Sequence, residues 1–168
     1  MITSIKQMIK IDSEIVAEYI LFKYGPMSHL KLQKLLYYVQ AYHLAYFGEP
    51  LFDDDFEAWV HGPVSRALYE KHREQSVLYD DVGYKLEDGK PSPELILNEL
   101  LTSEQVELIN EVLDEYSKLN GFELENETHG EAPWIEARKG FGNADRCNAI
   151  ISKASMKEYY STRLNAEA

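Results

Sequence analysis

Hydrophobic positions are densest between residues 35 and 47, where only Gln40 and His43 interrupt the apolar and aromatic side chains. A helix that is hydrophobic all round has to be buried, either in protein or in a membrane. This segment is too short and too rich in tyrosine to span a bilayer. The pattern therefore predicts a buried central helix, capped by Ser28 and ended by Gly48, around which the rest of the chain packs.

A second helix is predicted immediately before the central one. Residues 15–22 carry apolar side chains at helical spacing, and either Asp12 or Ser13 is a suitable cap. The helix should end near Tyr24, because proline in the following Gly25-Pro26 pair cannot continue it. The gap to the central helix is short, so we expect the two helices to pack as antiparallel neighbours.

Shorter elements separated by turns are predicted beyond the central helix. Alternation indicates a half-buried strand at 56–60, and Gly62-Pro63 is expected to break it before a helix over 64–72. Residues 82–86 fit a second short strand. Residues 123–134 are expected to be irregular. Three more helices are predicted, from 103 to about 120, from 133 to about 139 and from 152 to about 161.

Together these elements predict a mainly α fold. We expect a single compact helical domain over residues 1–168, built around the long central helix, with a small two- or three-stranded β element. A chain of 168 residues is long enough to bury a core without metals or disulfides. Its one cysteine, Cys147, excludes an internal disulfide and suits the reducing cytosol.

The charge balance bears on the partners that the protein can have. The formal net charge is −12, from 17 basic and 29 acidic residues. Such a field repels a phosphate backbone, so nucleic acid is not expected as a partner, whereas a basic protein would be attracted. Solubility alone is the simpler explanation of the acidity. No signal peptide and no membrane-spanning stretch are apparent, so we expect a cytoplasmic protein without a membrane partner.

No catalytic, metal-binding or cofactor-binding motif stands out in the sequence. His29 and His43 are 14 residues apart in one predicted helix, or about 21 Å, which is too far to share a metal ion. The run Asp53–Asp55 lacks the glycine and glutamate of a calcium-binding loop. Glycine-rich phosphate-binding motifs are missing. We therefore expect no catalytic residues, no metal and no cofactor.

Two bends that contain aromatic residues are the candidate binding segments instead. Trp59–Pro63 and Thr128–Trp134 each combine tryptophan, histidine, glycine and proline. Each tryptophan would ordinarily pack on the core while glycine and proline shape the turn. Alternatively, the two bends border one groove in which a partner segment docks. The 12 tyrosines favour this alternative, because one core cannot readily supply hydrogen-bond partners for so many hydroxyl groups.

Several segments resemble the SocA-like, or Panacea, antitoxin domain, also called GepA-like and common in prophages and other mobile elements. They are KLQKLLYY at 31–38, GEPLF at 48–52, EAWVHGPV at 57–64, Thr128-His129, Pro133-Trp134 and the closing helix at 152–160. The resemblance covers nearly the whole chain. It implies a compact, mainly helical domain with no known enzymatic activity. It also implies an antitoxin of a type II-like toxin–antitoxin system, which neutralises a cognate toxin, usually encoded next door, by direct binding.

The bends and two lysines are the candidate partner-binding residues, with the lysines at the rim of the recognition surface. The full set is Lys31, Lys34, Trp59, His61, Gly62, Pro63, Thr128, His129 and Trp134. One alternative is a prophage protein that binds a host regulator or acts as an adaptor delivering its partner to a protease. Another is a small hydrolase using His61 and His129, which requires these two side chains to converge on a nucleophile or metal in a pocket.

Overall fold

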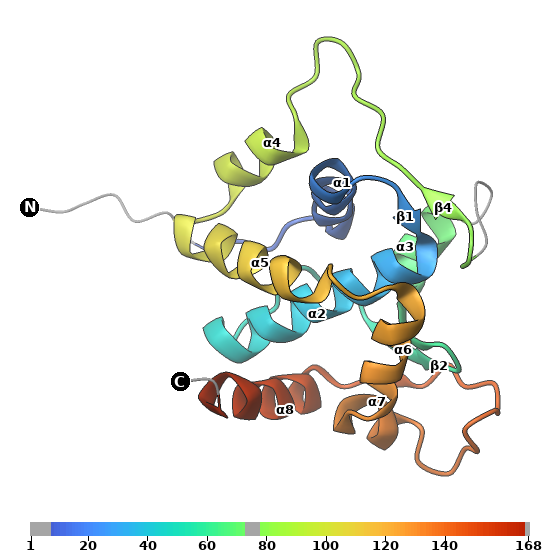
Figure 1. Ribbon diagram of the computed structural model, residues 1–168. Helices are drawn as coiled ribbons and strands as arrows, with labels where there is room; N and C mark the ends of the chain where they lie inside the picture. Colours follow the sequence, from blue (N-terminus) through green and yellow to red (C-terminus); the bar gives the residue numbers. More distant parts are fainter. Residues whose placement is uncertain (1–7, 73–77, 167–168) are drawn as a thin grey trace, which may run out of the picture.

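The long helix α2 (His29–Phe47) lies at the centre of the protein (Figure 1). The computed structural model describes residues 8–72 and 78–166. The hydroxyl of Ser28 accepts a hydrogen bond from the backbone N–H of Lys31, and Gly48 ends the helix in the left-handed conformation. Most side chains of α2 are buried on every side. The predicted central helix is therefore confirmed, including both of its ends.

The helix α1 (Ser13–Tyr24) begins and ends where the sequence predicts, with the Asp12 carboxylate accepting from the backbone N–H of Glu14. Its orientation differs from the expected antiparallel one. Figure 1 shows α1 nearly end-on while α2 lies across the view, so the two helices cross. The reason is the connection, because strand β1 (Met27–Ser28) extends the chain and pairs with β4 (Asp81–Val82) between the helices.

Other helices cover α2 on opposite sides. In Figure 1, α5 and α8 flank α2, while α4 packs on α1. Their bounds are α3 (Arg66–His72), α4 (Pro93–Leu100), α5 (Ser103–Tyr116), α6 (Gly121–His129), α7 (Ala132–Ala137) and α8 (Lys153–Ala166). Across the described ranges, none of the helices combines the length and the apolar character needed to cross a membrane. The result is the mainly α architecture that the sequence predicts.

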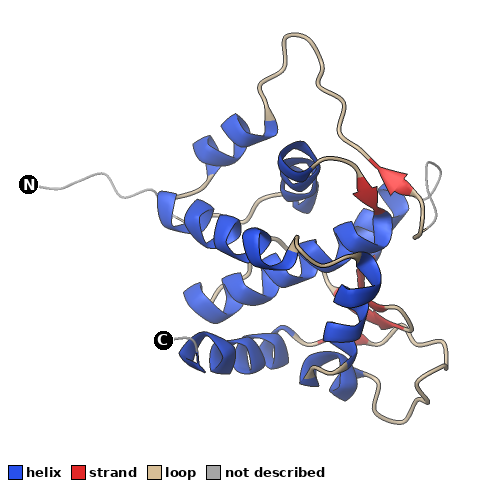
Figure 2. Ribbon diagram, in the orientation of Figure 1, coloured by secondary structure: helices blue, strands red, loops and turns tan. Residues whose placement is uncertain are grey.

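A three-stranded antiparallel sheet forms the lower right of the molecule (Figure 2). Strand β2 (Phe56–Trp59) is central and pairs with β3 (Gly62–Ser65) on one edge and β5 (Ile150–Ile151) on the other. The prediction that Gly62-Pro63 leads directly into a helix is wrong. These residues begin β3 after a two-residue turn. Pro63 is tolerated because β3 is an edge strand, where a missing N–H costs little.

Two helices were not predicted from the hydrophobic pattern. The segment expected to be irregular at 123–134 contains most of α6, and no element was predicted for α4, although Ser92 caps it and Pro93 begins it. In α6 the side chain of Asn120 accepts from the backbone of Glu123, whose carboxylate accepts from the backbone of Asn120. Only Leu124 and Thr128 of α6 are buried, so an amphipathic period is nearly absent.

The core accommodates more tyrosines than expected by bonding them to one another and to a buried carboxylate. Tyr38 and Tyr160 both donate to Oε1 of Glu131, at 2.8 and 2.7 Å. Tyr160 also contacts the hydroxyl of Tyr37 at 3.1 Å. Burial raises the pKa of Glu131, while the two tyrosine hydrogen bonds oppose that shift. The expectation that a core cannot satisfy so many tyrosines is therefore wrong for these three tyrosines.

Candidate partner-binding site

The hairpin of β2 and β3 carries the first of the two bends. Val60 and His61 form its turn, and Gly62 closes it with φ of +98°, a conformation that favours glycine. A Cβ atom at position 62 would lie 2.6 Å from Cε of Lys34 and 2.8 Å from Oγ1 of Thr128. The hairpin therefore lies in direct contact with α2 and α6, and this position has no room for a side chain.

Lys34 is fully buried beneath the hairpin. Its Nζ donates to the carbonyl oxygen of Pro63 at 2.9 Å. Burial lowers the pKa of Lys34 to about 7, although the nearby charge of Glu125 opposes the shift. The sequence-based placement of Lys34 at the rim of a recognition surface is wrong, because α2 is covered on all sides at this position. Lys34 instead holds the second strand of the hairpin against the central helix.

The second bend, at Thr128–Trp134, meets the first. The indole N–H of Trp134 donates to the carbonyl oxygen of Trp59 at 2.8 Å, and Trp134 is buried. His129 stacks on Trp134 with ring centroids 4.2 Å apart, and burial lowers the pKa of His129. Thr128 is buried and its hydroxyl donates to the backbone of α6. The two bends thus form one unit, as the docking hypothesis requires.

An exposed aromatic cluster lies next to this unit. Nδ1 of His61 is 2.7 Å from Oε1 of Glu125, an ion pair when the histidine is protonated. The hydroxyl of Tyr79 lies 3.2 Å from Nε2 of His61, and the Tyr79 ring stacks on Phe122 with centroids 6.0 Å apart. Tyr79 is 51% exposed and Phe122 is 61% exposed. We call His61, Tyr79 and Phe122 the hairpin face.

Sequence reasoning identified His61 but missed the other members of this cluster. Phe122 lies in α6, which had no clear hydrophobic period, and Tyr79 lies outside any strongly patterned segment. Large aromatic side chains that remain exposed together are typical of protein interfaces. The available signal was the capping box of Asn120 and Glu123, which places the residues after Asn120 in the first turn of a helix.

Trp59 is half-buried at the other end of the hairpin turn. Its indole N–H donates to Oε1 of Glu57 at 3.0 Å, and the guanidinium of Arg66 lies over its ring at 5.5 Å. Arg66 also donates to both oxygens of Glu57, which lowers the pKa of that carboxyl group. Tyr69 packs edge-on against the Trp59 ring. Trp59 is therefore held in place by charged and aromatic neighbours while part of it faces solvent.

Lys31 also has a structural anchor. Its Nζ donates to the carbonyl oxygen of Ser117 at 2.7 Å, just beyond the end of α5, and partial burial lowers its pKa. Unlike Lys34, Lys31 remains partly exposed. Of the two lysines, only Lys31 is thus placed where its charge can reach a partner.

The two histidines of the hydrolase hypothesis do not share a pocket. A cavity of about 600 Å³ beside α7 is lined by His129, Trp134 and Phe141, but His61 does not line it. The Thr128 hydroxyl is bonded to the backbone rather than to either histidine. Within residues 8–72 and 78–166, no group of three His, Cys, Asp or Glu side chains could hold a metal ion.

Comparison with known proteins bears directly on this unit. The family described as "Antitoxin SocA-like, Panacea domain" matches residues 32–135, more than half of the chain. The chain belongs to this SocA-like antitoxin family. The matched range includes Lys34, the hairpin, α6 and Trp134, so both bends lie inside the SocA-like domain.

A curated relative supports the same assignment. Antitoxin SocA of Caulobacter vibrioides (strain NA1000 / CB15N) is 41% identical over 63 residues, which is 35% of this chain and 34% of that protein. The chain therefore spans about a third of the length of the curated relative it matches. No solved structure matches the SocA-like chain.

Proposed function

We propose that this SocA-like protein is an antitoxin that neutralises a cognate toxin by direct protein binding, without catalysing a reaction. The single observation that carries the proposal is its membership of the SocA-like antitoxin family. We further propose that the toxin is encoded by the adjacent gene, that both proteins act in the cytoplasm of a cell carrying a prophage or related element, and that nucleic acid is not a partner.

The hairpin face is the proposed contact surface for the toxin. It combines two exposed aromatic rings with a histidine–glutamate pair, a composition suited to an energetic centre of an interface. The residues around it have supporting roles. Lys34, Gly62 and Thr128 hold the hairpin against α2 and α6, and Trp134 fixes its first strand. Trp59 and Lys31 border the surface.

Rigidity of the support favours this choice of surface. A partner that docks on a surface already ordered in the free protein loses less entropy on binding. The buried contacts of Lys34 and Trp134 each join segments far apart in the sequence, so the hairpin is held from two sides. Phe122 projects from α6, which packs on the hairpin, and Tyr79 lies between Leu78 and Asp80, whose carbonyl oxygens accept hydrogen bonds from the backbone N–H groups of Leu30 and His29 at 2.7 and 3.0 Å.

The test is co-expression of the chain with the product of the adjacent gene. Wild-type protein should restore growth and co-purify with the neighbouring product. The double variant Tyr79→Ala/Phe122→Ala should lose both effects. Leu86→Ala/Leu95→Ala is the matched control, because these side chains are 68% and 53% exposed and belong to α4 and the loop before it, which lie away from α6 and the hairpin in Figure 1. The control should behave like wild type.

Two outcomes would contradict the proposal in different ways. A neighbouring product that is harmless when expressed alone would remove the support for an antitoxin role. Full rescue by the Tyr79→Ala/Phe122→Ala variant would leave the role intact and exclude the hairpin face as the contact surface. Unchanged unfolding transitions for both variants are needed to attribute a loss of binding to the surface.

A further inference from the structure

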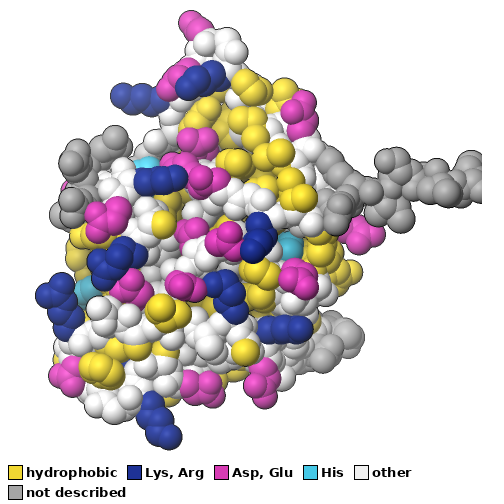
Figure 3. Space-filling model, turned by 180° about the vertical axis from the view of Figure 1, so that it is seen from behind, with side chains coloured by type: hydrophobic (Ala, Val, Ile, Leu, Met, Phe, Trp, Pro, Cys, Tyr) yellow, Lys and Arg dark blue, Asp and Glu magenta, His cyan; other side chains and the backbone are white. Residues whose placement is uncertain are grey.

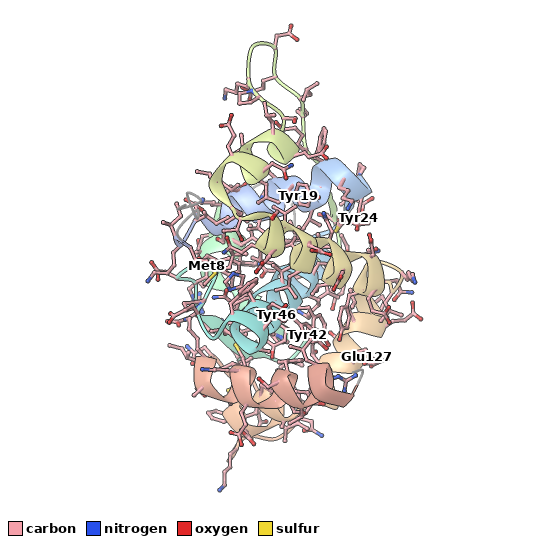
Figure 4. The ribbon with its side chains drawn as sticks, turned by 90° about the vertical axis from the view of Figure 1, so that its left-hand side faces the viewer. Met8, Tyr19, Tyr24, Tyr42, Tyr46 and Glu127 are labelled. Carbon is pink, nitrogen blue, oxygen red and sulfur yellow. The ribbon has the colours of Figure 1, made fainter. Side chains whose placement is uncertain are left out.

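A groove separate from the hairpin face runs between α5 and α8. Both helices pack against α2, and the groove between them has a volume of about 410 Å³. Figure 4 shows this side of the molecule, with Tyr42 and Tyr46 of α2 between α5 and α8. The apolar and aromatic residues that line it are Tyr42, Leu108, Val112, Tyr116, Leu119 and Leu164.

The rim of the groove is acidic. Glu111 and Glu115 of α5 and Glu127 of α6 line it together with one exposed lysine, Lys118, and Figure 4 labels Glu127 near the end of α8. None of these three carboxylates forms a salt bridge with any residue that the structure describes. The whole of α5 has five acidic residues and no lysine or arginine. On the face in Figure 3, by contrast, basic side chains lie among the acidic ones.

A buried carboxyl group lies behind the groove. Glu131 is 3% exposed, and its Oε2 has no hydrogen-bond partner among the residues that the structure describes, since both tyrosine hydroxyls bond to Oε1. Glu131 interacts electrostatically with Tyr42, Tyr116 and Arg163, which all line the groove. Among the described lining residues the two cations are Arg163, which is partly buried and bonds to Tyr159, and Lys118, which is exposed.

We propose that this groove binds an amphipathic helix of a partner protein, with leucine-type side chains on one face flanked by lysine or arginine. The apolar floor accounts for the hydrophobic face of the occupant, and the unpaired carboxylates on the rim account for its basic flanks. This inference rests on the proposed role as a protein-binding antitoxin, and it defines the chemistry of a second contact with the partner.

The dimensions fit a helical occupant. Glu104, Glu107, Glu111 and Glu115 follow one another at three- and four-residue intervals, so they form a single exposed stripe along α5. At 1.5 Å per residue the stripe is roughly 16 Å long. A partner helix of about three turns would therefore place a basic residue opposite an acidic one on each turn.

Synthetic peptides test this chemistry without requiring the toxin. The probe is a fluorescent peptide of about 16 residues with leucine and lysine at amphipathic helical spacing. We expect it to bind the purified protein, with affinity that falls at least about tenfold when the salt concentration is raised about tenfold. A leucine–glutamate peptide should not bind. A serine–lysine peptide of equal charge should bind at least about tenfold more weakly, because it cannot fill the floor.

Protein variants locate the binding. Glu111→Lys/Glu115→Lys should weaken binding of the leucine–lysine peptide at least about tenfold. Glu94→Lys/Glu99→Lys on α4 is the matched control, since it changes the net charge equally at exposed positions, and it should have less than about a twofold effect.

Three results of the peptide assays would overturn the inference. They are absence of peptide binding, equal losses in the two charge-reversal variants, and equal binding of the serine–lysine peptide, which would indicate attraction by net charge alone. A groove variant that changes the oligomeric state instead of peptide affinity would identify a second copy as the occupant and also overturn the proposal. Growth rescue can succeed while peptide binding fails, so this test and that of the antitoxin role are separable.

Discussion

Lys34, the lysine beneath the hairpin, makes the free energy of unfolding depend on pH. The size of this effect follows from the burial of its amine. Lys34 is fully buried, and burial lowers its pKa from 10.5 to about 7. One pKa unit corresponds to about 1.36 kcal/mol. Keeping this side chain charged in the folded state therefore costs about 5 kcal/mol relative to the unfolded chain.

The direction of the effect follows from proton binding. Between about pH 7 and pH 10.5 the unfolded chain holds a proton on Lys34 that the folded protein has lost. The free energy of unfolding therefore rises with pH in that range. From about pH 7 to about pH 9 the contribution of Lys34 is an increase of about 2 kcal/mol. Lys34→Met keeps the aliphatic stem, removes the amine, and should abolish this increase.

Urea unfolding at constant ionic strength at about pH 7, 8 and 9 measures the effect. Lys31→Met is the control, because Lys31 also donates to a backbone carbonyl but remains partly exposed. It should keep most of the wild-type increase. If Lys34→Met shows the same rise as wild type, the buried amine is not its source and the account of the hairpin support is incorrect.

Three further predictions concern the same region. Gly62→Ala should lower the free energy of unfolding by about 3 kcal/mol, as measured by urea unfolding. Gly89→Ala is the control, because Gly89 also has a positive φ but open space around it, and it should lower the free energy of unfolding by about 1 kcal/mol. Trp134→Phe should cost about 1–2 kcal/mol by leaving the Trp59 carbonyl without its donor, as thermal unfolding would record. Burial lowers the pKa of His29 from 6.5 to about 4. The free energy of unfolding of the wild type should therefore fall by up to about 3 kcal/mol when the pH is lowered from about 6.5 to about 4, and His29→Gln should reduce that fall.

The sequence predicts an element well when its ends carry local signals. Both α1 and α2 have a capping side chain at the start and a glycine at the end, so their boundaries agree with the structure. The hairpin was mistaken because Pro63 usually ends a strand, and only the sheet order reveals that β3 lies at an edge. In α6 the helix depends on its caps rather than on an apolar face, so periodicity does not detect it.

In the candidate site, too, the residues with local sequence signals were predicted and those that depend on tertiary packing were not. The tryptophan, glycine and proline residues indicated two bends. The hydrogen bond between Trp134 and Trp59 shows that these bends meet. Tyr79 and Phe122 are separated by more than 40 residues, and only packing brings their rings together. Lys34 directly precedes the apolar stretch at 35–47, and only the packing of the hairpin on α2 shows that its amine is buried.

Calorimetry of the purified protein with the product of the adjacent gene gives the dissociation constant of the proposed complex. We expect a stoichiometric complex whose affinity falls at least about tenfold in Tyr79→Ala/Phe122→Ala and stays within about twofold of wild type in Leu86→Ala/Leu95→Ala. Absence of a complex, or equal affinity for both double variants, would contradict this proposal.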